Sequence, residues 1–142
     1  MSSSALALED CPFCALAGTR LARPAPAGHD AVAAYADDKI VVLLQRDTTS
    51  VLVAPSTHVD RLAELTERPL AGFLAALRRV AVDVQAVFGC SGTTIEPRKD
   101  VLPSAHGHIS FEVIPSPQSY ANARASGDLM VRAEQLADLI RD

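Results

Sequence analysis

Two cysteines near the start of the chain have the spacing of metal ligands. Two residues separate Cys11 from Cys14, so a single turn can present both thiols to one ion. Zinc prefers four sulfur or nitrogen ligands in a tetrahedron, and two cysteines with two histidines are a common set. His58 and the pair His106 and His108 are candidates for the remaining positions. The competing hypothesis is a redox pair, which typically follows a strand at the start of a helix. No strand is predicted before Cys11, which favours metal binding.

A second stretch able to do chemistry lies near residue 110. Residues 107–114 read as a strand that ends at Pro115. Because alternate side chains of a strand share a face, the apolar residues of this stretch should pack on the core while its polar residues point the other way. The polar set is His106, His108, Ser110 and Glu112. A solvated face would carry Thr, Lys or Arg as often as His, so the pattern favours a functional site over accidental histidines, which remain the alternative.

The elements that must hold these groups follow from hydrophobic periodicity. Apolar residues at three- and four-residue spacing predict one long amphipathic helix over 67–88 and a last helix over 128–140. Strands are predicted over 31–35, 39–44, 50–54, 92–96 and 107–114. Strands, one long helix and then further strands indicate an α+β fold with a mostly antiparallel five-stranded sheet.

Local signals define turns and boundaries. Asp37-Asp38 is predicted to turn the chain between the first two strands, and residues 47–49 to close a hairpin between the second and third. Thr66 can cap the long helix, and Gly89 fits its end. Residues 1–10 read as a flexible tail, 18–30 as a mobile loop, and 11–142 as one domain.

Composition excludes some functions. The chain has 142 residues, of which 49% are hydrophobic, so one domain can bury a real core. Its net charge is −4, and its densest basic stretches, Arg78–Arg79 and Arg98–Lys99, read as solvated surface pairs. Nucleic-acid binding is therefore not expected. No signal peptide or membrane span is visible, which predicts a cytoplasmic protein without disulfides, with Cys90 as a small buried residue.

Three motifs in this order resemble a known family. They are Asp10-Cys-Pro-Phe-Cys14, Ala54-Pro-Ser-Thr-His58, and His108-Ile-Ser-Phe-Glu-Val-Ile-Pro115. Over residues 11–116 the chain resembles the histidine-triad superfamily of nucleotide hydrolases and transferases, in particular its zinc-binding subset. The resemblance implies a histidine-triad-like fold with an N-terminal zinc knuckle and a structural zinc ion on Cys11, Cys14, His58 and His108. It also implies a homodimer.

The resemblance breaks down at the reactive positions. Aligned on the terminal Val-Ile-Pro, His108 is the first triad residue, while Ser110 and Glu112 replace the second and third histidines. The family's second histidine attacks the α-phosphorus, whereas a serine needs a base, for which Glu112 or His106 are the candidates. The Glu112 carboxylate would also repel phosphate. An alternative register places the first two triad histidines on His106 and His108, so that Ser110 replaces only the third.

The substrate pocket implied by the resemblance is altered as well. Gln45 stands near the place of an acidic residue that holds ribose, and Ser104 lies in the changed loop before the triad strand. Together with Ser110 they are the candidate substrate-binding residues.

These departures predict a zinc-binding protein that is not an ordinary nucleotidyl hydrolase. The expected ligand is a small molecule of the nucleotide or phosphate-containing class, and neither nucleic acid nor membrane is an expected partner. One alternative is an enzyme of nonstandard chemistry that uses Ser110, Glu112 and His106 as acid–base groups. Another is an ordinary nucleotide phosphoramidase or hydrolase.

Overall fold

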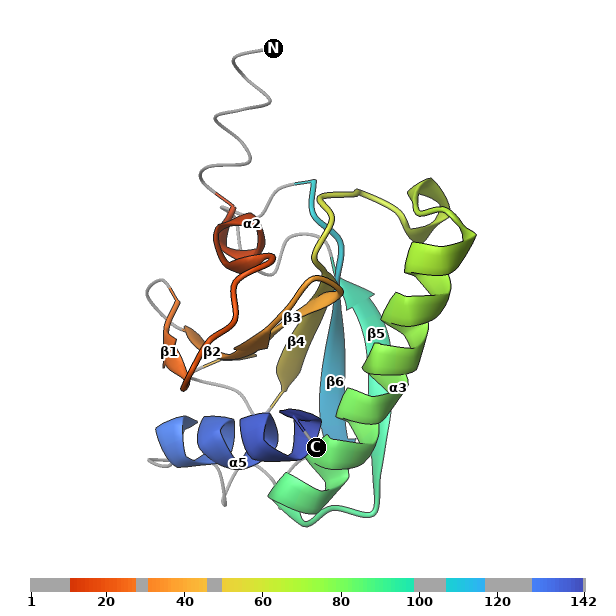
Figure 1. The fold of residues 1–142 in the computed structure, drawn as a ribbon. Coiled ribbons are helices and arrows are strands. Elements are labelled where there is room, and N and C mark those ends of the chain that lie inside the picture. Colours follow the sequence, from red (N-terminus) through yellow and green to blue (C-terminus); the bar gives the residue numbers. More distant parts are fainter. Residues whose placement is uncertain (1–10, 28–30, 46–49, 99–106, 117–128, 142) are drawn as a thin grey trace.

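An antiparallel six-stranded sheet forms the centre of the molecule (Figure 1). The computed structural model describes residues 11–27, 31–45, 50–98, 107–116 and 129–141. The strand order is β1-β2-β3-β4-β6-β5. The strands are β1 (Ala25–Pro26), β2 (Ala31–Ala36), β3 (Ile40–Gln45), β4 (Val51–Pro55), β5 (Gly92–Arg98) and β6 (Ser110–Ser116). This confirms the predicted α+β class.

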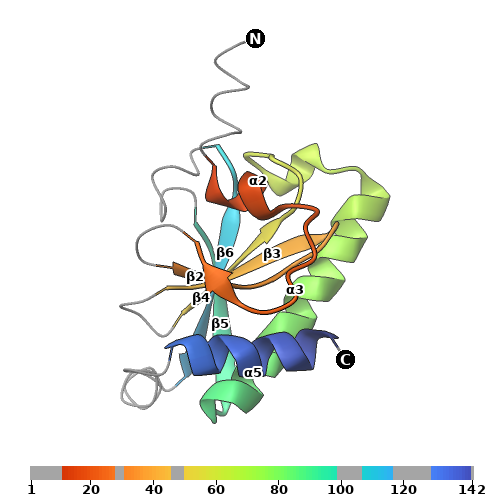
Figure 2. The same cartoon turned by 60° about the vertical axis from the view of Figure 1, so that its left-hand side comes forward.

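Helices cover both faces of the sheet (Figures 1 and 2). The long helix α3 (Glu67–Phe88) and the last helix α5 (Leu129–Arg141) share one hydrophobic core with one face. The short helix α2 (Pro12–Leu16) and the segment after it pack on the opposite face, where a second core contains Cys11 and Phe13. A 3-10 turn, η1 (Leu62–Glu64), precedes α3. Within the described ranges, no helix is long and apolar enough to cross a membrane.

The predicted alternation along the triad strand is confirmed. Ile109, Phe111 and Val113 belong to the core beneath α3. Glu112 pairs across the strands with Leu52, a residue of the opposite core, and therefore lies on the other face. The predicted hairpin between the second and third strands is also present, with Ile40 opposite Pro55.

Several predicted boundaries were wrong. The sheet has a sixth strand, β1, inside the segment predicted to be a mobile loop. The triad strand begins at Ser110 instead of residue 107, because Gly107 has φ +80°, which is incompatible with extended backbone. Strand β5 continues through Arg98, since its residues keep pairing with β6. Thr66 occupies the N-cap position of α3 but its side chain forms no capping hydrogen bond.

Two arginines join α3 and α5. Arg79 Nη2 donates to the Leu139 carbonyl at 2.8 Å, and Arg132 Nη1 donates to the Val87 carbonyl at 2.9 Å. Arg79 also forms an ion pair with Asp83 at 3.3 Å. Arg79 is exposed, as predicted for a surface charge, and it also links the two helices.

Some predicted features fall on residues that the structure does not describe. The tail at 1–10, residues 28–30, the turn at 47–49, and both Ser104 and His106 lie outside the described residues. Cys90 is half-buried rather than buried, and its thiol donates to the Gly92 carbonyl at 3.3 Å.

Candidate metal centre and triad strand

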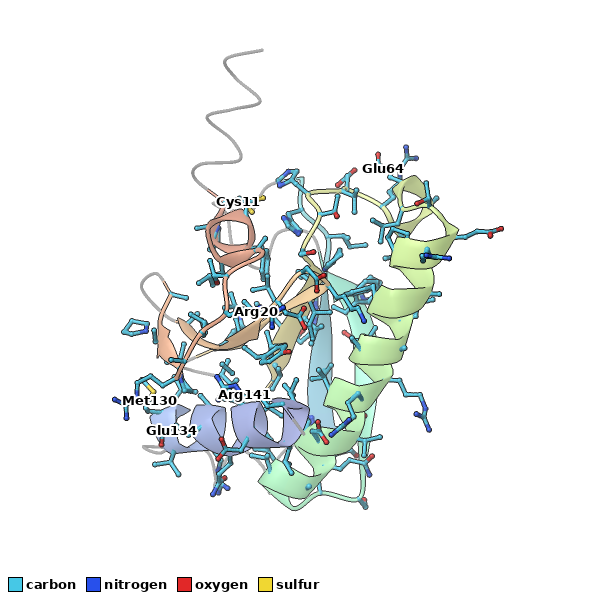
Figure 3. The ribbon with its side chains drawn as sticks, viewed as in Figure 1. Cys11, Arg20, Glu64, Met130, Glu134 and Arg141 are labelled. Atoms are coloured by element: carbon cyan, nitrogen blue, oxygen red, sulfur yellow. The ribbon has the colours of Figure 1, made fainter. Side chains whose placement is uncertain are left out.

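Three separate segments bring the four predicted metal ligands together. Cys11 is the N-cap of α2 and Cys14 lies in its first turn, where the Ala15 amide donates to the Cys11 carbonyl at 2.9 Å. His58 follows the end of β4, and His108 precedes the start of β6. Because β4 and β6 are antiparallel neighbours, the end of one meets the start of the other. Helix α2 lies over this end of the sheet, with Cys11 facing it (Figure 3).

The spacing of the ligand atoms fits a tetrahedral zinc ion. The ligand atoms of Cys11, Cys14, His58 and His108 all lie within 4.8 Å of one another. The sulfur–nitrogen distances are 3.4, 3.1 and 3.5 Å, and the two Nδ1 atoms are 3.2 Å apart. Bond lengths of about 2.3 Å to sulfur and about 2.05 Å to nitrogen give tetrahedral edges of about 3.6 Å and about 3.3 Å. These four edges agree with the expected values within about half an ångström, so the donor set and its spacing suit zinc.

The orientation of His108 is fixed by a hydrogen bond on its far side. Its Nε2 lies 2.7 Å from the Pro55 carbonyl, which can only accept, so Nε2 carries the proton and Nδ1 presents its lone pair to the cluster. The ring is 1% exposed and lies 5.1 Å from the Phe13 ring, centroid to centroid. A metal-binding histidine typically has such an outer partner.

Protonation in the cluster also favours a cation. Burial lowers the pKa of His108 to about 4, despite the bond to Pro55, with a further decrease from His58. The imidazole is therefore neutral and able to donate a lone pair. Burial, followed by the charge and hydrogen bonding of Cys11, raises the pKa of Cys14 to about 12. Two adjacent thiolates are thus unfavourable on their own, and a bound divalent cation would reverse this because it neutralises both.

Gly107 allows the close approach of the chain to His58. Its φ is +80°, and a Cβ built at this position would lie 3.3 Å from His58 Nε2. Any side chain here would both strain the backbone and press on a metal ligand.

The fold of this chain is similar to that of several solved structures. No protein-family model and no curated protein matches the sequence. A zinc-bound histidine-triad family protein from Mycobacterium smegmatis is 20% identical, covers 94% of this chain and 95% of its own, and has a TM-score of 0.62. A HIT-like protein involved in cell-cycle regulation from Bartonella henselae is 19% identical, with 78% and 88% covered and a TM-score of 0.55. The chain has the histidine-triad fold.

A third similar structure is that of a hypothetical histidine-triad nucleotide-binding protein from Sulfolobus tokodaii. It is 16% identical, covers 80% of this chain and 85% of its own, and has a TM-score of 0.55. At such identities the likeness establishes the fold, and the chemistry must come from the residues of this chain.

The hydroxyl of Ser110, the residue predicted to stand at the second triad position, forms a hydrogen bond. Ser110 is 2% exposed, and its Oγ donates to the Arg98 carbonyl at 3.2 Å. A serine hydroxyl has one proton, so this bond directs it to a group that cannot act as a base. The described partners of Ser110 therefore do not activate it.

The carboxylate of Glu112, the residue predicted to stand at the third triad position, is paired with an arginine. Arg98 Nε donates to Glu112 Oε1 at 2.7 Å, and Arg98 Nη2 donates to Glu96 Oε1 at 3.0 Å. The predicted repulsion of phosphate by Glu112 is thus weakened by a guanidinium. Arg98 is exposed, as predicted for a surface charge, and it also lies between two carboxylates and contacts both Ser110 and Glu112.

The candidate substrate residues are not assembled in the described part of the chain. Gln45 is the last residue of β3, at the end of the strand that lies away from the metal centre, where its side chain accepts a hydrogen bond from Ser50 at 3.0 Å. Phe111 pairs with Val53, so the preceding residue Ser110 lies opposite Ala54. Ala54 is four residues after Ser50 in the chain, and Ser50 contacts Gln45. At about 3.3 Å per residue, Gln45 and Ser110 are separated by about 13 Å along the strands.

Sequence reasoning missed three groups: the Pro55 carbonyl, Gly107 and Arg98. The carbonyl has no sequence signal. A glycine next to a metal-binding histidine was a visible signal, since such residues often allow close backbone approach. The role of Arg98 depends on strand register, which places it opposite Ser110.

Proposed function

We propose that this protein is a zinc-stabilised, small-molecule-binding member of the histidine-triad fold that does not form a nucleotidyl intermediate. The observation that carries the proposal is the hydrogen bond from the Ser110 hydroxyl to the Arg98 carbonyl. A serine in place of the nucleophilic histidine needs a base to become reactive. Among the described residues, the two titratable groups that flank it on its own face are unsuited, because Glu112 is paired with Arg98 and His108 Nδ1 faces the metal cluster.

A structural role for zinc is supported by the number of ligands. Cys11, Cys14, His58 and His108 would fill a tetrahedron, which leaves no position for water or substrate. The ion would link α2 to the ends of β4 and β6. The zinc-bound histidine-triad protein of Mycobacterium smegmatis supports the same assignment. The placement of His108 in this cluster also supports the register in which His108 is the first triad residue.

A pocket beside the metal centre supports ligand binding. It has a volume of about 280 Å³ and lies between the segment leading to His58 and the first turns of α3. Pro55, Leu65 and Phe73 give it apolar walls. Its charged lining residues are Lys39, Arg68 and Asp38, so positive charge exceeds negative charge by one. An apolar cavity with a few charged groups is typical of a small-molecule site, and this charge suits an anionic ligand such as a nucleotide.

The test combines turnover and binding. Wild type and Ser110→Ala are incubated with nucleoside phosphoramidates and dinucleoside polyphosphates, and products are followed by chromatography. We expect no turnover by either protein, and an increase in melting temperature with a binding nucleotide such as AMP. Turnover by wild type that Ser110→Ala abolishes would refute the proposal and favour an enzyme with an activated serine. Turnover that survives this substitution would favour an ordinary hydrolase.

The zinc proposal has its own measurement. Elemental analysis of the purified chain should give one zinc per chain, and Cys14→Ser should lose it. Chelation should lower the melting temperature, since metal-binding energy contributes to folding. Full stability without metal would contradict a structural role. None of the three cysteines, all of which are described, forms a disulfide, which supports a proposed cytoplasmic location.

We also propose a homodimer formed by α3 and the edge strand β5. Leu74 and Val82 on α3 are 43% and 50% exposed, and Ile95 on β5 is 41% exposed. Ile95 pairs with Val113, a residue of the core beneath α3, so it lies on the same side of the sheet as that helix. Light scattering should give the mass of two chains, and Val82→Glu should give one. A monomeric wild type would contradict this proposal.

A further inference from the structure

A separate pocket opens at the end of β2. Strand β1 pairs only with Val32 and Ala33, so the last residues of β2 extend past its neighbour. The segment that follows α2 and the end of α5 close this space, which has a volume of about 240 Å³. Its lining residues are Arg20, Leu21, Tyr35, Ala36, Asp37 and Arg141.

Two arginines from distant parts of the chain converge on this pocket. Arg20 lies between two anchor points: the Gly18 amide donates to the Asp37 carbonyl at 3.2 Å, and Arg141 Nη2 donates to the Leu21 carbonyl at 2.6 Å. The backbone on both sides of Arg20 is therefore held against β2 and α5. Figure 3 shows Arg20 and Arg141 on the same side of the molecule, from the segment after α2 and from the end of α5.

Among the described residues that line the pocket, the only carboxylate is already engaged. Asp37 Oδ1 accepts the amides of Lys39 at 2.7 Å and Ile40 at 2.9 Å, and Oδ2 accepts the Tyr35 hydroxyl at 2.8 Å. These bonds hold the β2–β3 turn. Asp37 is therefore a structural acceptor rather than a bound partner of the guanidinium groups.

The arginines keep donors for a ligand. Among the described residues, Arg20 forms no ion pair. Arg141 has one carboxylate within reach, that of Asp138 at 4.0 Å, which is 82% exposed and contributes little. With Asp37 included, the lining carries two positive charges and one negative charge.

The guanidinium groups of Arg20 and Arg141 both influence the hydroxyl of Tyr35. Burial and the hydrogen bond to Asp37 raise the pKa of Tyr35, while Arg20 and Arg141 each act to lower it. The positive potential of two residues that are far apart in sequence therefore reaches the same hydroxyl, which remains protonated and able to hydrogen-bond.

We propose that this pocket binds the phosphate group of a small molecule between Arg20 and Arg141. A guanidinium presents a planar pair of N–H donors that matches phosphate oxygens, and two such groups can flank one tetrahedral anion. Drug-sized ligands occupy pockets of about 300–1,000 Å³, so this volume suits a phosphate with a small organic part. The site lies outside the metal centre and the altered triad, and it does not depend on either.

The experiment is a calorimetric titration of the full chain with inorganic phosphate, glycerol 3-phosphate and acetate at constant ionic strength. We expect saturable binding of the two phosphates and much weaker binding of acetate. Arg20→Gln should weaken phosphate binding at least tenfold. Arg141→Lys keeps the positive charge but loses the planar pair of N–H donors, and should weaken phosphate binding several-fold. Arg23→Gln is the matched control, because Arg23 is an exposed residue of the same segment that does not line the pocket.

Each outcome bears on the proposal. Tighter binding of glycerol 3-phosphate than of inorganic phosphate supports a phosphate ester as ligand, and equal binding supports the free anion. Absent saturation, equal affinity for acetate, or binding unchanged in Arg20→Gln would overturn the assignment. Melting curves and zinc content are measured on the same samples, so that loss of fold or of the metal centre is distinguished from loss of the phosphate site.

Discussion

Replacing Gly107 by alanine tests how the chain supports the metal centre. The residue has φ +80°, and an added Cβ would lie 3.3 Å from His58 Nε2. Contact at this distance requires the neighbouring atom to move by a few tenths of an ångström. His58 faces Cys14 through Nδ1, 3.1 Å from the sulfur, so a movement of the ring displaces the ligand atom itself.

The expected magnitude has two parts. A left-handed backbone conformation in a residue with a Cβ destabilises the folded state by roughly 1–2 kcal/mol. The displaced ring should also weaken zinc binding by about 10- to 100-fold, the range found when a group that orients a metal ligand is changed. Gly107→Ala should therefore lose both folding stability and metal affinity.

Gly18→Ala is the matched control. Gly18 also has φ +80°, but no atom lies within 4 Å of a Cβ built there. It should show the backbone penalty of roughly 1–2 kcal/mol without a change in zinc affinity. Stability is measured by urea unfolding of the zinc-loaded chains, and affinity by competition with a chromogenic chelator. Equal zinc affinities for the two variants would refute the argument that Gly107 is needed for close approach to His58.

Three further predictions concern stability. Ser110→Ala should lower the free energy of unfolding by about 0.5–1.5 kcal/mol through one lost hydrogen bond, with zinc content unchanged, and any loss of zinc would contradict the assigned ligand set. Arg79→Met leaves the Asp83 side chain, 8% exposed, without its cation and should cost about 1–3 kcal/mol in urea unfolding. Asp83→Asn in that background should restore part of the loss. Leu136→Ala, at a fully buried position, should cost about 2–5 kcal/mol in thermal denaturation. Met130→Ala, at a residue 39% exposed, is its control, with a change expected within about 0.5 kcal/mol.

Elements with strong periodicity were predictable from sequence. The helix predicted over 67–88 is present as Glu67–Phe88, because its apolar residues repeat at helical spacing and Gly89 adopts φ 64° after its last turn. The short elements β1 and α2 were not predicted, since two and five residues are too few to show a period. Helix α2 forms because tertiary packing buries Cys11 and Phe13 against the sheet, and β1 forms because it pairs with Val32 and Ala33 of β2.

The sequence by itself determined the chemical types available to this protein. The Cys11-x-x-Cys14 spacing, the histidines at 58 and 108, and the presence of Ser110 and Glu112 on one strand are all readable without a structure. The cysteines and histidines define which kind of ion the protein can hold, and the serine and glutamate motivate the prediction of a changed triad.

Only the tertiary structure decided how these groups meet. His108 lies 97 residues from Cys11 and 50 from His58, and the antiparallel pairing of β4 with β6 brings the three segments together. The pairing of β5 with β6 likewise places Arg98 against Ser110 and Glu112, so that both side chains are engaged. Strand register is set by the packing of whole faces, and no local pattern around Arg98 encodes it.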